Sequence, residues 1–360
     1  GLGGLGAATA LTHAGRSVLV LEQAEQPGGY AVTFDRPPFR FDASLHALDG
    51  FAPGGGNDAL LRRLAVADQV DLRRLDPLYL VRRPAGDLCV SADPHEYEEM
   101  LVETYPAEQA GIRSWLDTCW RAHVETVRFR ADARAHRLPR LAELGTRFPT
   151  LVDLSGRAWR DVTLEHVRDP EVAGLLTALW SYTATPPSRL SALTGMVVTA
   201  SYLYYGGWYP IGGSGTLPNA LAANLVRDGA TLTYGARVER IEAAHGRATG
   251  VTTVEGDTYD ADVVVCNAAA PLLADMLDDD VVPLDYLART TRPTVATSSV
   301  TVFLGLDRDV FAENGLPHEV IVGAIADVDA DPRGTPDEWV GGGILATDYT
   351  HVDPGCCLLY

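Results

Sequence analysis

An α/β fold built on a nucleotide-binding βαβ unit is predicted by three features of the sequence. The chain opens on the glycine-rich segment GLGGLGAA (residues 1–8), and apolar residues then recur every three to four positions through residue 14, as in a helix. The apolar run 17–21 is typical of a buried parallel strand, and it ends at Glu22. Valine- and threonine-rich segments bounded by glycines follow within 231–266, where further strands are expected.

The opening glycines suit a turn that binds a diphosphate. One glycine permits a tight turn, one lets the backbone approach the diphosphate at the helix N-terminus, and one allows the helix to pack closely on the sheet. Two registers are open: Gly1, Gly3 and Gly6 match the pattern literally, or the first glycine lies upstream and Gly1 and Gly4 are the second and third. The second register is preferred because it brings Glu22 nearer the expected spacing of about 20 residues.

Glu22 is placed where a carboxylate can bind a ribose. An acid at the carboxyl end of this strand can accept hydrogen bonds from the ribose hydroxyls, and it repels a 2′-phosphate. The sequence therefore predicts a dinucleotide site at which NADP is disfavoured.

The paired glycine that follows separates FAD from NAD. Gly28 and Gly29 come six residues after Glu22, and backbone amides without side chains can reach a diphosphate there. A plain Pro-Gly-Gly turn is the alternative. The pair resembles the second diphosphate-contacting segment of glutathione-reductase-type flavoproteins, and this resemblance, after a βα unit, favours FAD.

Taken together, these segments resemble a known family. Gly1 to Gly4, Glu22, residues 27–29 and residues 39–46 (FRFDASLH) resemble the N-terminal part of the phytoene desaturase, carotenoid isomerase and retinol saturase group of FAD-dependent oxidoreductases, within the amine-oxidase-like superfamily. The similarity continues over residues 207–217, 220–221, 229–232, 238–241, 250–251 and 263–268. The chain departs from the family at two places. Tyr30 stands where Arg or another residue usually follows the paired glycine, and the Asp-x-Gly pattern is replaced by residues 42–44 (DAS).

The resemblance implies a Rossmann-like FAD-binding domain of the glutathione-reductase type with an inserted α+β substrate domain. The expected division is residues 1–75 and 207–284 for the FAD-binding domain, with 76–206 (largely helical) and 285–360 for the substrate domain. The last FAD-binding segment of the family, which lies near the C-terminus, is not found in this sequence. The first strand of the βαβ unit is not found either, since the sequence opens on the glycine-rich turn. We therefore expect a fragment lacking both ends of a protein of about 480–520 residues.

The resemblance also implies which residues bind FAD. Backbone at Val238 is expected to contact the adenine. The full set of expected cofactor-binding residues is Gly1, Gly3, Gly4, Glu22, Gly28, Gly29, Tyr30, Val238, Asn267 and Ala268.

Several further elements are predicted along the chain. A helix is expected at 217–227 and strands at 231–234, 236–242, 250–254 and 261–266. In the substrate domain we expect a hairpin of 78–81 with 88–90, mostly helix over 95–180, a strand at 297–306, and irregular acidic loops to residue 337. The core aromatics expected in the helical part are Trp115, Trp120, Trp159 and Trp180.

Residues 190–226 carry no charged residue and no histidine. Glycines and prolines interrupt the run repeatedly from Gly206 onward, so only 190–205 could form a continuous helix, which is short for a bilayer. One interpretation is a buried core helix. The other is that its aromatic end, with Tyr204 and Trp208, lines an apolar substrate tunnel.

The chemistry expected from the resemblance is redox chemistry on a lipophilic polyene. The leading hypothesis is an FAD-dependent oxidoreductase that desaturates or saturates carbon–carbon bonds; the alternatives are a flavin-dependent carotenoid cis–trans isomerase and a flavin-binding pseudoenzyme or interaction protein. Asp42 and His46 are the candidate acid–base residues, and holding the loop or the flavin edge by hydrogen bonds is their alternative role. The sequence contains no HExxH or CxxC motif, so no metal site is expected.

The composition narrows the partners. The formal charge is −19, and all 29 basic residues are arginine. Such an acidic chain is a poor binder of nucleic acid. The absence of lysine disfavours those amine oxidases that use a lysine near the flavin. We expect a lipophilic small-molecule substrate and cysteines in the reduced thiol form. We also expect a cytoplasmic location, with peripheral contact to a membrane for substrate uptake. The sequence leaves the oligomeric state open.

Overall fold

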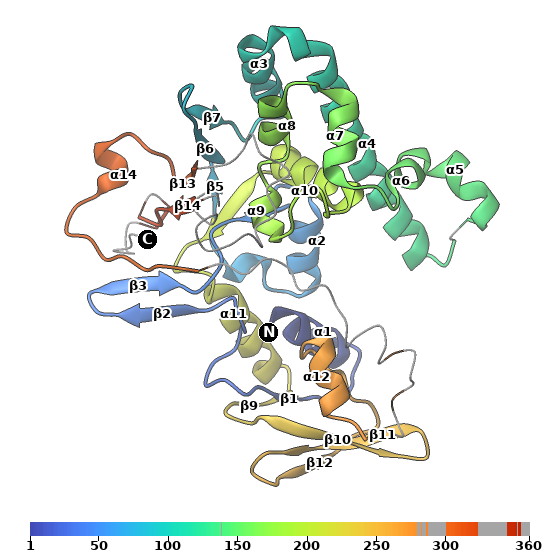
Figure 1. Ribbon diagram of the computed structural model, residues 1–360. Coiled ribbons are helices and arrows are strands. Elements are labelled where there is room, and N and C mark those ends of the chain that lie inside the picture. Colours follow the sequence, from blue (N-terminus) through green and yellow to red (C-terminus); the bar gives the residue numbers. More distant parts are fainter. Residues whose placement is uncertain are drawn as a thin grey trace. The chain divides into compact units, whose positions relative to one another are not determined.

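The chain forms two compact units, seen in the ribbon of the computed structural model in Figure 1. The structure describes residues 1–137, 139–278, 282, 286, 300–322, 344–350, 352 and 353. Unit 1 comprises Gly1–His46, Ala59–Leu72 and Pro210–Val295. Unit 2 comprises Ala47–Asp58, Arg73–Tyr209 and Ala296–Tyr360. Each unit is thus assembled from segments that are distant in the sequence.

Unit 1 is centred on a short parallel sheet flanked by two helices. Strand β1 (Leu19–Leu21) pairs in parallel with β9 (Thr231–Thr233), with Leu19 opposite Thr231. Helices α1 (Leu2–His13) and α11 (Thr216–Arg227) pack against each other, and they bury the apolar face that includes Leu5, Leu221 and Leu225. Gly15 follows α1 with φ +75°, the left-handed conformation that commonly ends a helix.

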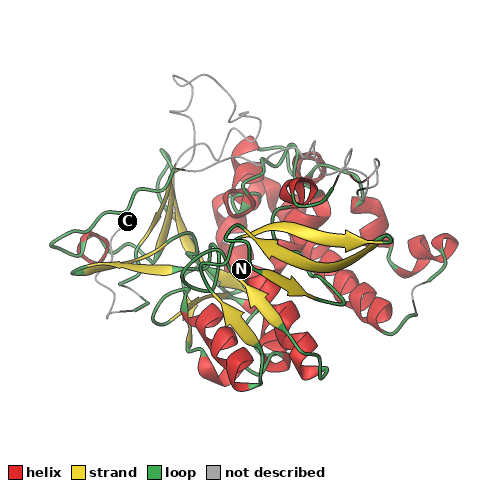
Figure 2. Cartoon of the chain, turned by 90° about the horizontal axis from the view of Figure 1, so that it is seen from below, coloured by secondary structure: helices red, strands yellow, loops and turns green. Residues whose placement is uncertain are grey.

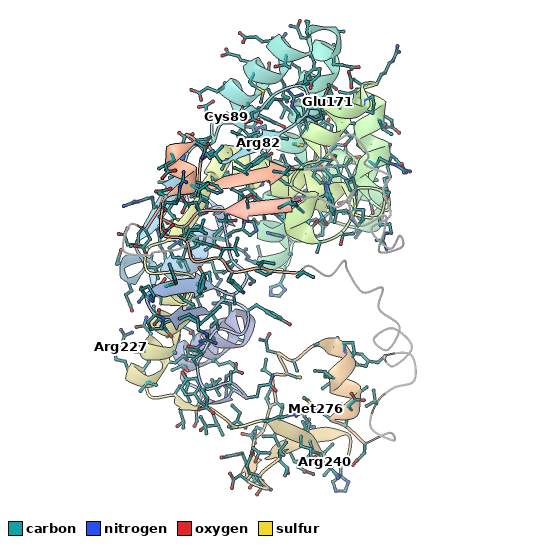
Figure 3. All side chains as sticks on the ribbon, turned by 60° about the vertical axis from the view of Figure 1, so that its left-hand side comes forward. Arg82, Cys89, Glu171, Arg227, Arg240 and Met276 are labelled. Carbon is teal, nitrogen blue, oxygen red and sulfur yellow. The ribbon has the colours of Figure 1, made fainter. Side chains whose placement is uncertain are left out.

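An antiparallel meander and a hairpin complete unit 1. The meander is β10 (Val238–Ala244), β11 (Arg247–Thr253) and β12 (Thr258–Asp260). The Ile241 N–H donates to the carbonyl of Met276, labelled in Figure 3, which ties the end of α12 (Ala270–Asp275) to this sheet. The hairpin is β2 (Thr33–Arg36) with β3 (Phe39–Asp42). These segments also contain residues 59–63 of helix α2 (Gly56–Arg63) and the 3₁₀ turn η1 (Ala67–Gln69).

Most of the helices in the described part of the chain, red in Figure 2, belong to unit 2. The 26-residue helix α4 (Gln109–Arg134) packs along α10 (Ala192–Tyr205). Trp115 of α4 and Trp159 of α7 are fully buried, with ring centroids 6.4 Å apart. A Cβ on Gly195 would lie 2.2 Å from the Trp159 ring, so the glycine is what lets α10 approach α7. The other helical elements are α3 (Pro94–Thr104), η2 (Pro106–Glu108), η3 (Leu141–Glu143), α5 (Leu144–Arg147), α6 (Pro149–Leu154), α7 (Trp159–His166), α8 (Pro170–Leu176), α9 (Trp180–Thr183) and α14 (Val310–Glu313).

Local sequence explains where several of these helices begin. Asp93 precedes Pro94 and accepts hydrogen bonds from the N–H groups of His95 and Glu96, which caps α3. Asp169 precedes Pro170 and accepts from the Glu171 N–H at the start of α8 in the same way. Carboxylate followed by proline is therefore the start signal that both helices share.

Two sheets lie in unit 2. The first has the order β14-β13-β6-β7, in which β6 (Tyr79–Arg82) and β7 (Leu88–Val90) form a hairpin, and β13 (Glu319–Val322) pairs in parallel with β6. Its edge strand is β14 (Ile344–Thr347). The second has the order β4-β8-β5, with β4 (Leu48–Asp49), β8 (Gly207–Pro210) and β5 (Leu72–Leu75). Helix α2 (Gly56–Arg63) follows β4 along the chain.

Most of the predicted elements are confirmed. The helix at 217–227, the strands at 231–234, 236–242 and 250–254, the hairpin near residue 84 and the helical character of 95–180 are all present, with bounds shifted by a few residues. Residues 192–205 form a continuous, partly buried core helix. Trp115 and Trp159 are core residues, whereas Trp120 and Trp180 are only partly buried.

Three predictions about strands are wrong. Residues 261–266 are irregular, and Val263 and Val265 are 73% and 56% exposed. Residues 300–306 are likewise irregular and exposed, while 297–299 lie outside the described residues. Both segments have strand-like composition, but a strand exists only when a neighbour completes its hydrogen bonds, and none of the described strands does so. Strand β1 is parallel as predicted, yet Leu19 is 39% exposed rather than buried.

Residues 47–58 and 207–209 group with unit 2, in which β8 pairs with both β4 and β5, and the predicted division into domains stays a prediction. Within 307–322, where irregular loops were expected, the structure has α14 and β13; residues 323–337 lie outside the described part. In the described part of the chain, no helix is both long and apolar enough to cross a membrane.

Candidate dinucleotide site

The N-terminus of α1 presents free backbone donors. The helix begins at Leu2 with Gly1 as its N-cap, and the first intrahelical bond runs from the Leu5 N–H to the Gly1 carbonyl at 3.1 Å. The N–H groups of the first helical turn therefore have no partner within the helix, and no side chain caps them. With the helix dipole, these groups favour an anion at this end.

The glycines of this turn are closely approached by Asn267. A Cβ on Gly3 would lie 2.8 Å from Asn267 Oδ1, and one on Gly4 would lie 3.3 Å from Asn267 Nδ2. A Cβ on Gly6, by contrast, would meet only Leu64 at 4.0 Å. Close packing thus occurs at Gly3 and Gly4 and not at Gly6, and the preference for the register with Gly1 and Gly4 stays a prediction.

The second glycine segment contacts the first. Gly28 has φ +124° and Gly29 has φ +66°, so both use backbone conformations that residues with a Cβ rarely adopt. A Cβ on Gly29 would lie 3.2 Å from Gly1 Cα. The fold therefore brings together the two segments that are predicted from the sequence to bind the diphosphate.

Glu22 lies beside the same turn. Its backbone N–H donates to the Thr233 carbonyl and its carbonyl accepts from the Ala236 N–H, which fixes it just beyond the β1–β9 pairing. The Gly1 nitrogen donates to Glu22 Oε2 at 3.2 Å, and the Ala24 N–H donates to Oε1 at 3.1 Å. The carboxylate is 18% exposed. The Ala24 N–H therefore orders the carboxylate, which lies beside the first turn of α1 and remains accessible to a ligand.

These residues fit a dinucleotide. Open backbone donors, glycines where a Cβ would intrude, and an oriented carboxylate are the features that bind a diphosphate and a ribose. The other predicted contact residues are more peripheral. Tyr30 is 86% exposed and its carbonyl accepts from Ser44 Oγ at 2.9 Å; Val238 is partly buried at the start of β10; Ala268 is exposed in the irregular segment after β12.

Asp42 lies at the end of β3 and is buried, with 3% of its surface exposed. Its carboxylate accepts hydrogen bonds from Ser214 N (2.9 Å to Oδ2), Ser214 Oγ (2.5 Å to Oδ1) and Thr33 Oγ1 (2.8 Å to Oδ1). Burial raises the pKa of Asp42, although the hydrogen bonds from Ser214 and Thr33 act in the opposite direction. These contacts are what the loop-holding interpretation of Asp42 requires, and the proton-transfer role stays a prediction.

Sequence reasoning missed the partners of Asp42. Gly213 has φ +91°, and a Cβ on it would lie 2.3 Å from Thr33 Oγ1; the Gly215 N–H donates to the same oxygen at 3.0 Å. The glycine-rich segment 212–215 (GGSG) could have indicated these partners, because glycines often mark places where another segment approaches the backbone closely. His46, the other acid–base candidate, is partly buried in the irregular segment after β3.

The aromatic residues proposed for a substrate tunnel lie in unit 2. The Tyr204 ring lies 4.3 Å from the Trp120 ring, and Trp208 Nε1 donates to the Tyr205 carbonyl at 2.7 Å. Both side chains are partly buried. The end of α10 is therefore an aromatic surface held in place by its neighbours.

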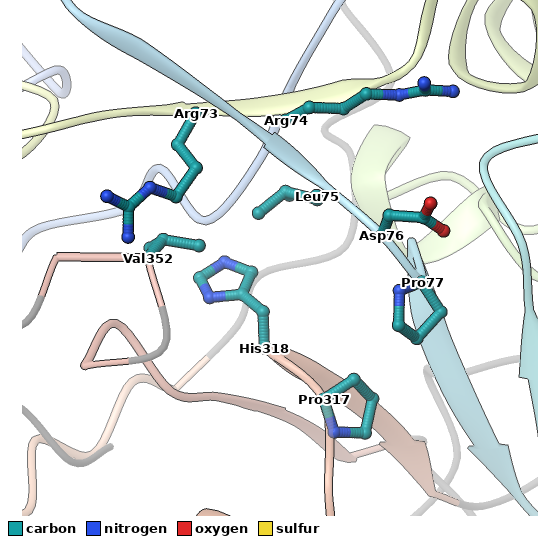
Figure 4. Close-up of a pocket in the computed structure, with 8 residues that line it drawn as sticks. All are labelled: Arg73, Arg74, Leu75, Asp76, Pro77, Pro317, His318 and Val352. Carbon is teal, nitrogen blue, oxygen red and sulfur yellow. The ribbon is translucent and has the colours of Figure 1, made fainter.

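Unit 2 also contains a small cavity of about 110 Å³, shown in Figure 4. It is lined by Arg73, Arg74, Leu75, Asp76, Pro77, Pro317, His318 and Val352. Pockets that enclose drug-sized ligands usually measure about 300–1,000 Å³. This cavity is too small to enclose a polyene.

Neither metal nor disulfide chemistry is supported by the described residues. Among them, no group of three or more His, Cys, Asp or Glu side chains could hold a metal ion. Cys119 is buried, Cys89 and Cys266 are exposed, and all three are free thiols; Cys356 and Cys357 lie outside the described residues.

The fold and this site define an α/β protein of the dinucleotide-binding flavoprotein class, and comparison with known proteins gives the family. The model of the flavin containing amine oxidoreductase family matches residues 2–340. The chain therefore belongs to the flavin-containing amine oxidoreductase family, whose members carry a flavin. The predicted fold class is confirmed.

The names of two curated relatives refer to prolycopene and to phytoene. Prolycopene isomerase 2 of an Oncidium hybrid cultivar is 29% identical over 276 residues, which cover 74% of this chain and 47% of that protein. Phytoene dehydrogenase of Streptomyces griseus is 31% identical over 289 residues, covering 76% and 53%. The chain thus spans about half the length of the curated relatives it matches. Both names fall within the group that the sequence resembles.

A solved structure shares the fold. An oxidoreductase from Methanosarcina mazei superposes with a TM-score of 0.58 at 18% identity, covering 81% of this chain and 62% of that one.

Proposed function

We propose that this chain forms the nucleotide-binding and substrate-facing parts of an FAD-dependent oxidoreductase that desaturates or saturates carbon–carbon bonds of a lipophilic polyene. The observation that carries the proposal is the glycine cradle, in which Gly1, Gly4 and Gly29 converge beside Glu22. The names of the phytoene dehydrogenase and prolycopene isomerase relatives supply the substrate class.

FAD is the flavin that fits this cradle, because FAD, unlike a flavin mononucleotide, has both a diphosphate for the backbone amides and an adenosine ribose for Glu22. The backbone amides of α1 and of the loop at Gly28 and Gly29 bind the diphosphate, and Glu22 accepts from the ribose hydroxyls. Tyr30, Val238, Asn267 and Ala268 form the rim of the site. When bound, FAD supplies the two-electron chemistry that a polyene carbon–carbon bond requires.

The protein's own part in the reaction is to bind, orient and exclude water. Asp42 fixes the Ser214 turn to the β2–β3 hairpin through Thr33. His46 is the residue we propose to exchange a proton with the polyene, because an imidazole can both donate and accept a proton. The absence of lysine from these 360 residues disfavours the reaction of those amine oxidases that use a lysine near the flavin.

A second function is favoured by the prolycopene isomerase relative. A flavin-dependent cis–trans isomerase would use the same cradle with no net change in oxidation state.

We also propose a cytoplasmic location with peripheral contact to a membrane, where a lipophilic substrate accumulates. Flotation of the protein with zwitterionic vesicles tests this contact.

The decisive experiment is to express the protein that carries this chain, record its bound-cofactor spectrum and analyse products from a polyene panel. We expect a flavin spectrum, release of FAD on denaturation, and products that differ from substrate by two hydrogens. Unchanged mass with altered geometry would identify the isomerase. A flavin that no polyene bleaches or reoxidises would identify a non-enzymatic flavoprotein, and a protein that binds NAD alone would overturn the FAD proposal.

A further inference from the structure

The C-terminal half of α4 concentrates positive charge in an otherwise acidic chain. Residues 127–147, from this half of the helix through α5, contain six arginines and two acidic residues, a net charge of +4, whereas the whole chain carries −19. Figure 1 shows α5 and α6 beside this end of α4. A partner that meets this part of unit 2 is therefore expected to be negatively charged.

One face of this half of α4 is used for packing within unit 2. Glu125, Phe129 and Asp132 follow the i, i+4, i+7 spacing, so they lie on the same face. Glu125 Oε1 accepts a hydrogen bond from Thr150 Oγ1 at 2.8 Å, and Asp132 Oδ2 accepts one from Arg147 Nη2 at 2.6 Å. The Phe129 ring packs edge to face against the ring of the residue that precedes α6. Both acidic side chains of this half are thus occupied inside the unit.

The opposite face of this half carries arginine and no acid. Val127, Arg130, Ala131 and Arg134 follow the i, i+3, i+4, i+7 spacing and are all exposed, Val127 to 51%. We call these four residues the arginine face. Arg130 and Arg134 are four residues apart, a spacing at which like charges destabilise a helix. An anionic surface would remove this repulsion.

Other arginines of the same helix are paired with acids. Arg113 Nε lies 2.7 Å from Glu98 Oε1, and Arg121 Nε lies 3.0 Å from Asp117 Oδ2. Within the described residues, neither arginine of the arginine face forms an ion pair. The chain has 48 acidic residues, so the lack of an acid here is a property of this face and not of the composition. These two charges are therefore available to a partner outside the chain.

A lipid surface matches the chemistry of this face. Guanidinium groups bind phosphate oxygens in a bidentate manner, and their aliphatic stems, like the exposed side chain of Val127, suit the boundary between headgroups and acyl chains. A short helical face with both kinds of group is typical of segments that lie on an anionic membrane.

We propose that the arginine face docks unit 2 on an anionic membrane surface, with Arg130 and Arg134 bound to lipid phosphates and Val127 at the acyl boundary. This inference rests on the membrane contact proposed above. It adds the class of lipid and the residues that make the contact.

The test measures flotation of the whole protein with two kinds of vesicle. One is phosphatidylcholine alone, and the other contains about one-third phosphatidylglycerol. The test variant carries Arg130→Gln with Arg134→Gln, and the matched control carries Arg113→Gln with Arg121→Gln on the same helix. Both variants remove two positive charges, so they differ only in which arginines are lost.

We expect the wild type to bind the anionic vesicles more tightly than the zwitterionic ones, and less tightly as salt screens the charges. The test variant should bind the anionic vesicles about 30-fold more weakly, equivalent to about 2 kcal/mol, while the control keeps most of the affinity. The unfolding temperature of the test variant should equal or exceed that of the wild type, because a repulsive pair is removed.

Equal flotation of the wild type with both vesicles overturns the inference alone, and so does equal loss in the two variants, which would reflect net charge. Loss of binding together with a lower unfolding temperature would make the two arginines structural. Self-association in sedimentation that the test variant abolishes would assign the face to a second copy of the chain instead. Flotation with neither vesicle overturns the membrane contact itself, whereas the flavin spectrum and the polyene products test the enzyme separately.

Discussion

The loop that carries Gly28 gives the sharpest test of the cradle. Gly28 has φ +124°, and a Cβ there would lie 2.3 Å from the Ala31 carbonyl oxygen and 3.0 Å from Pro218 Cγ. The nearest obstacle is backbone, which cannot rotate away as the end of a flexible side chain could. Replacing Gly28 by alanine therefore strains the loop through both its dihedral angles and its contacts.

The magnitude follows from those two effects. Holding a residue with a Cβ at such a φ costs about 1–3 kcal/mol. Forcing a methyl group into filled space costs about 1–3 kcal/mol more. The sum, about 2–6 kcal/mol, is comparable with the whole stability of many domains, about 5–15 kcal/mol. We therefore expect the loop to move away from Gly1 and the diphosphate seat to be lost.

The assay measures urea unfolding and flavin content of Gly28→Ala beside Gly229→Ala. Gly229 lies in the same unit with φ +92°, but a Cβ there meets nothing within 4 Å, so this control carries backbone strain without overlap. We expect Gly28→Ala to be less stable than the control by about 1–3 kcal/mol and to retain little flavin, whereas the control keeps its flavin. Equal stability of the two variants, or normal flavin content in Gly28→Ala, would refute the reasoning.

Three further predictions concern the candidate acid–base residues and the aromatic end of α10. Because burial raises the pKa of Asp42, the stability that its protonation contributes is full below the unfolded-state pKa and is lost as pH rises through the raised folded-state value. The wild type should accordingly lose stability relative to Asp42→Asn as pH rises from the ordinary aspartate pKa through the raised folded-state pKa, by about 1.4 kcal/mol for each pH unit that separates the two, and a pH-independent difference in urea unfolding would contradict this. His46→Ala should lower turnover about 10²–10⁴-fold at unchanged flavin content if His46 transfers a proton, and normal turnover would remove that role. Tyr204→Leu should reduce polyene turnover without loss of FAD; loss of FAD instead would show that the end of α10 is purely structural.

Much of the fold followed from local patterns. The helix periodicity after Gly1, the hairpin around residue 84 and the Val/Thr-rich strands of unit 1 were predicted because neighbouring residues are enough to favour these conformations. Residues 261–266 and 300–306 have the same strand-like composition but do not form strands. A segment forms a strand only when a neighbouring strand, often distant in the sequence, completes its hydrogen bonds. The composition of one segment does not show whether such a neighbour is present.

By itself, the sequence determined the chemistry that is available: glycines where backbone must be approached, an acid after the first strand, no lysine, and an uncharged stretch from residue 190 to residue 226. Only the tertiary structure decided what approaches each glycine. Asn267 lies over Gly3, Gly1 lies against Gly29, and Thr33 lies against Gly213. A glycine shows in the sequence that space is needed, but the atoms that use the space come from segments whose approach depends on the packing of the whole unit.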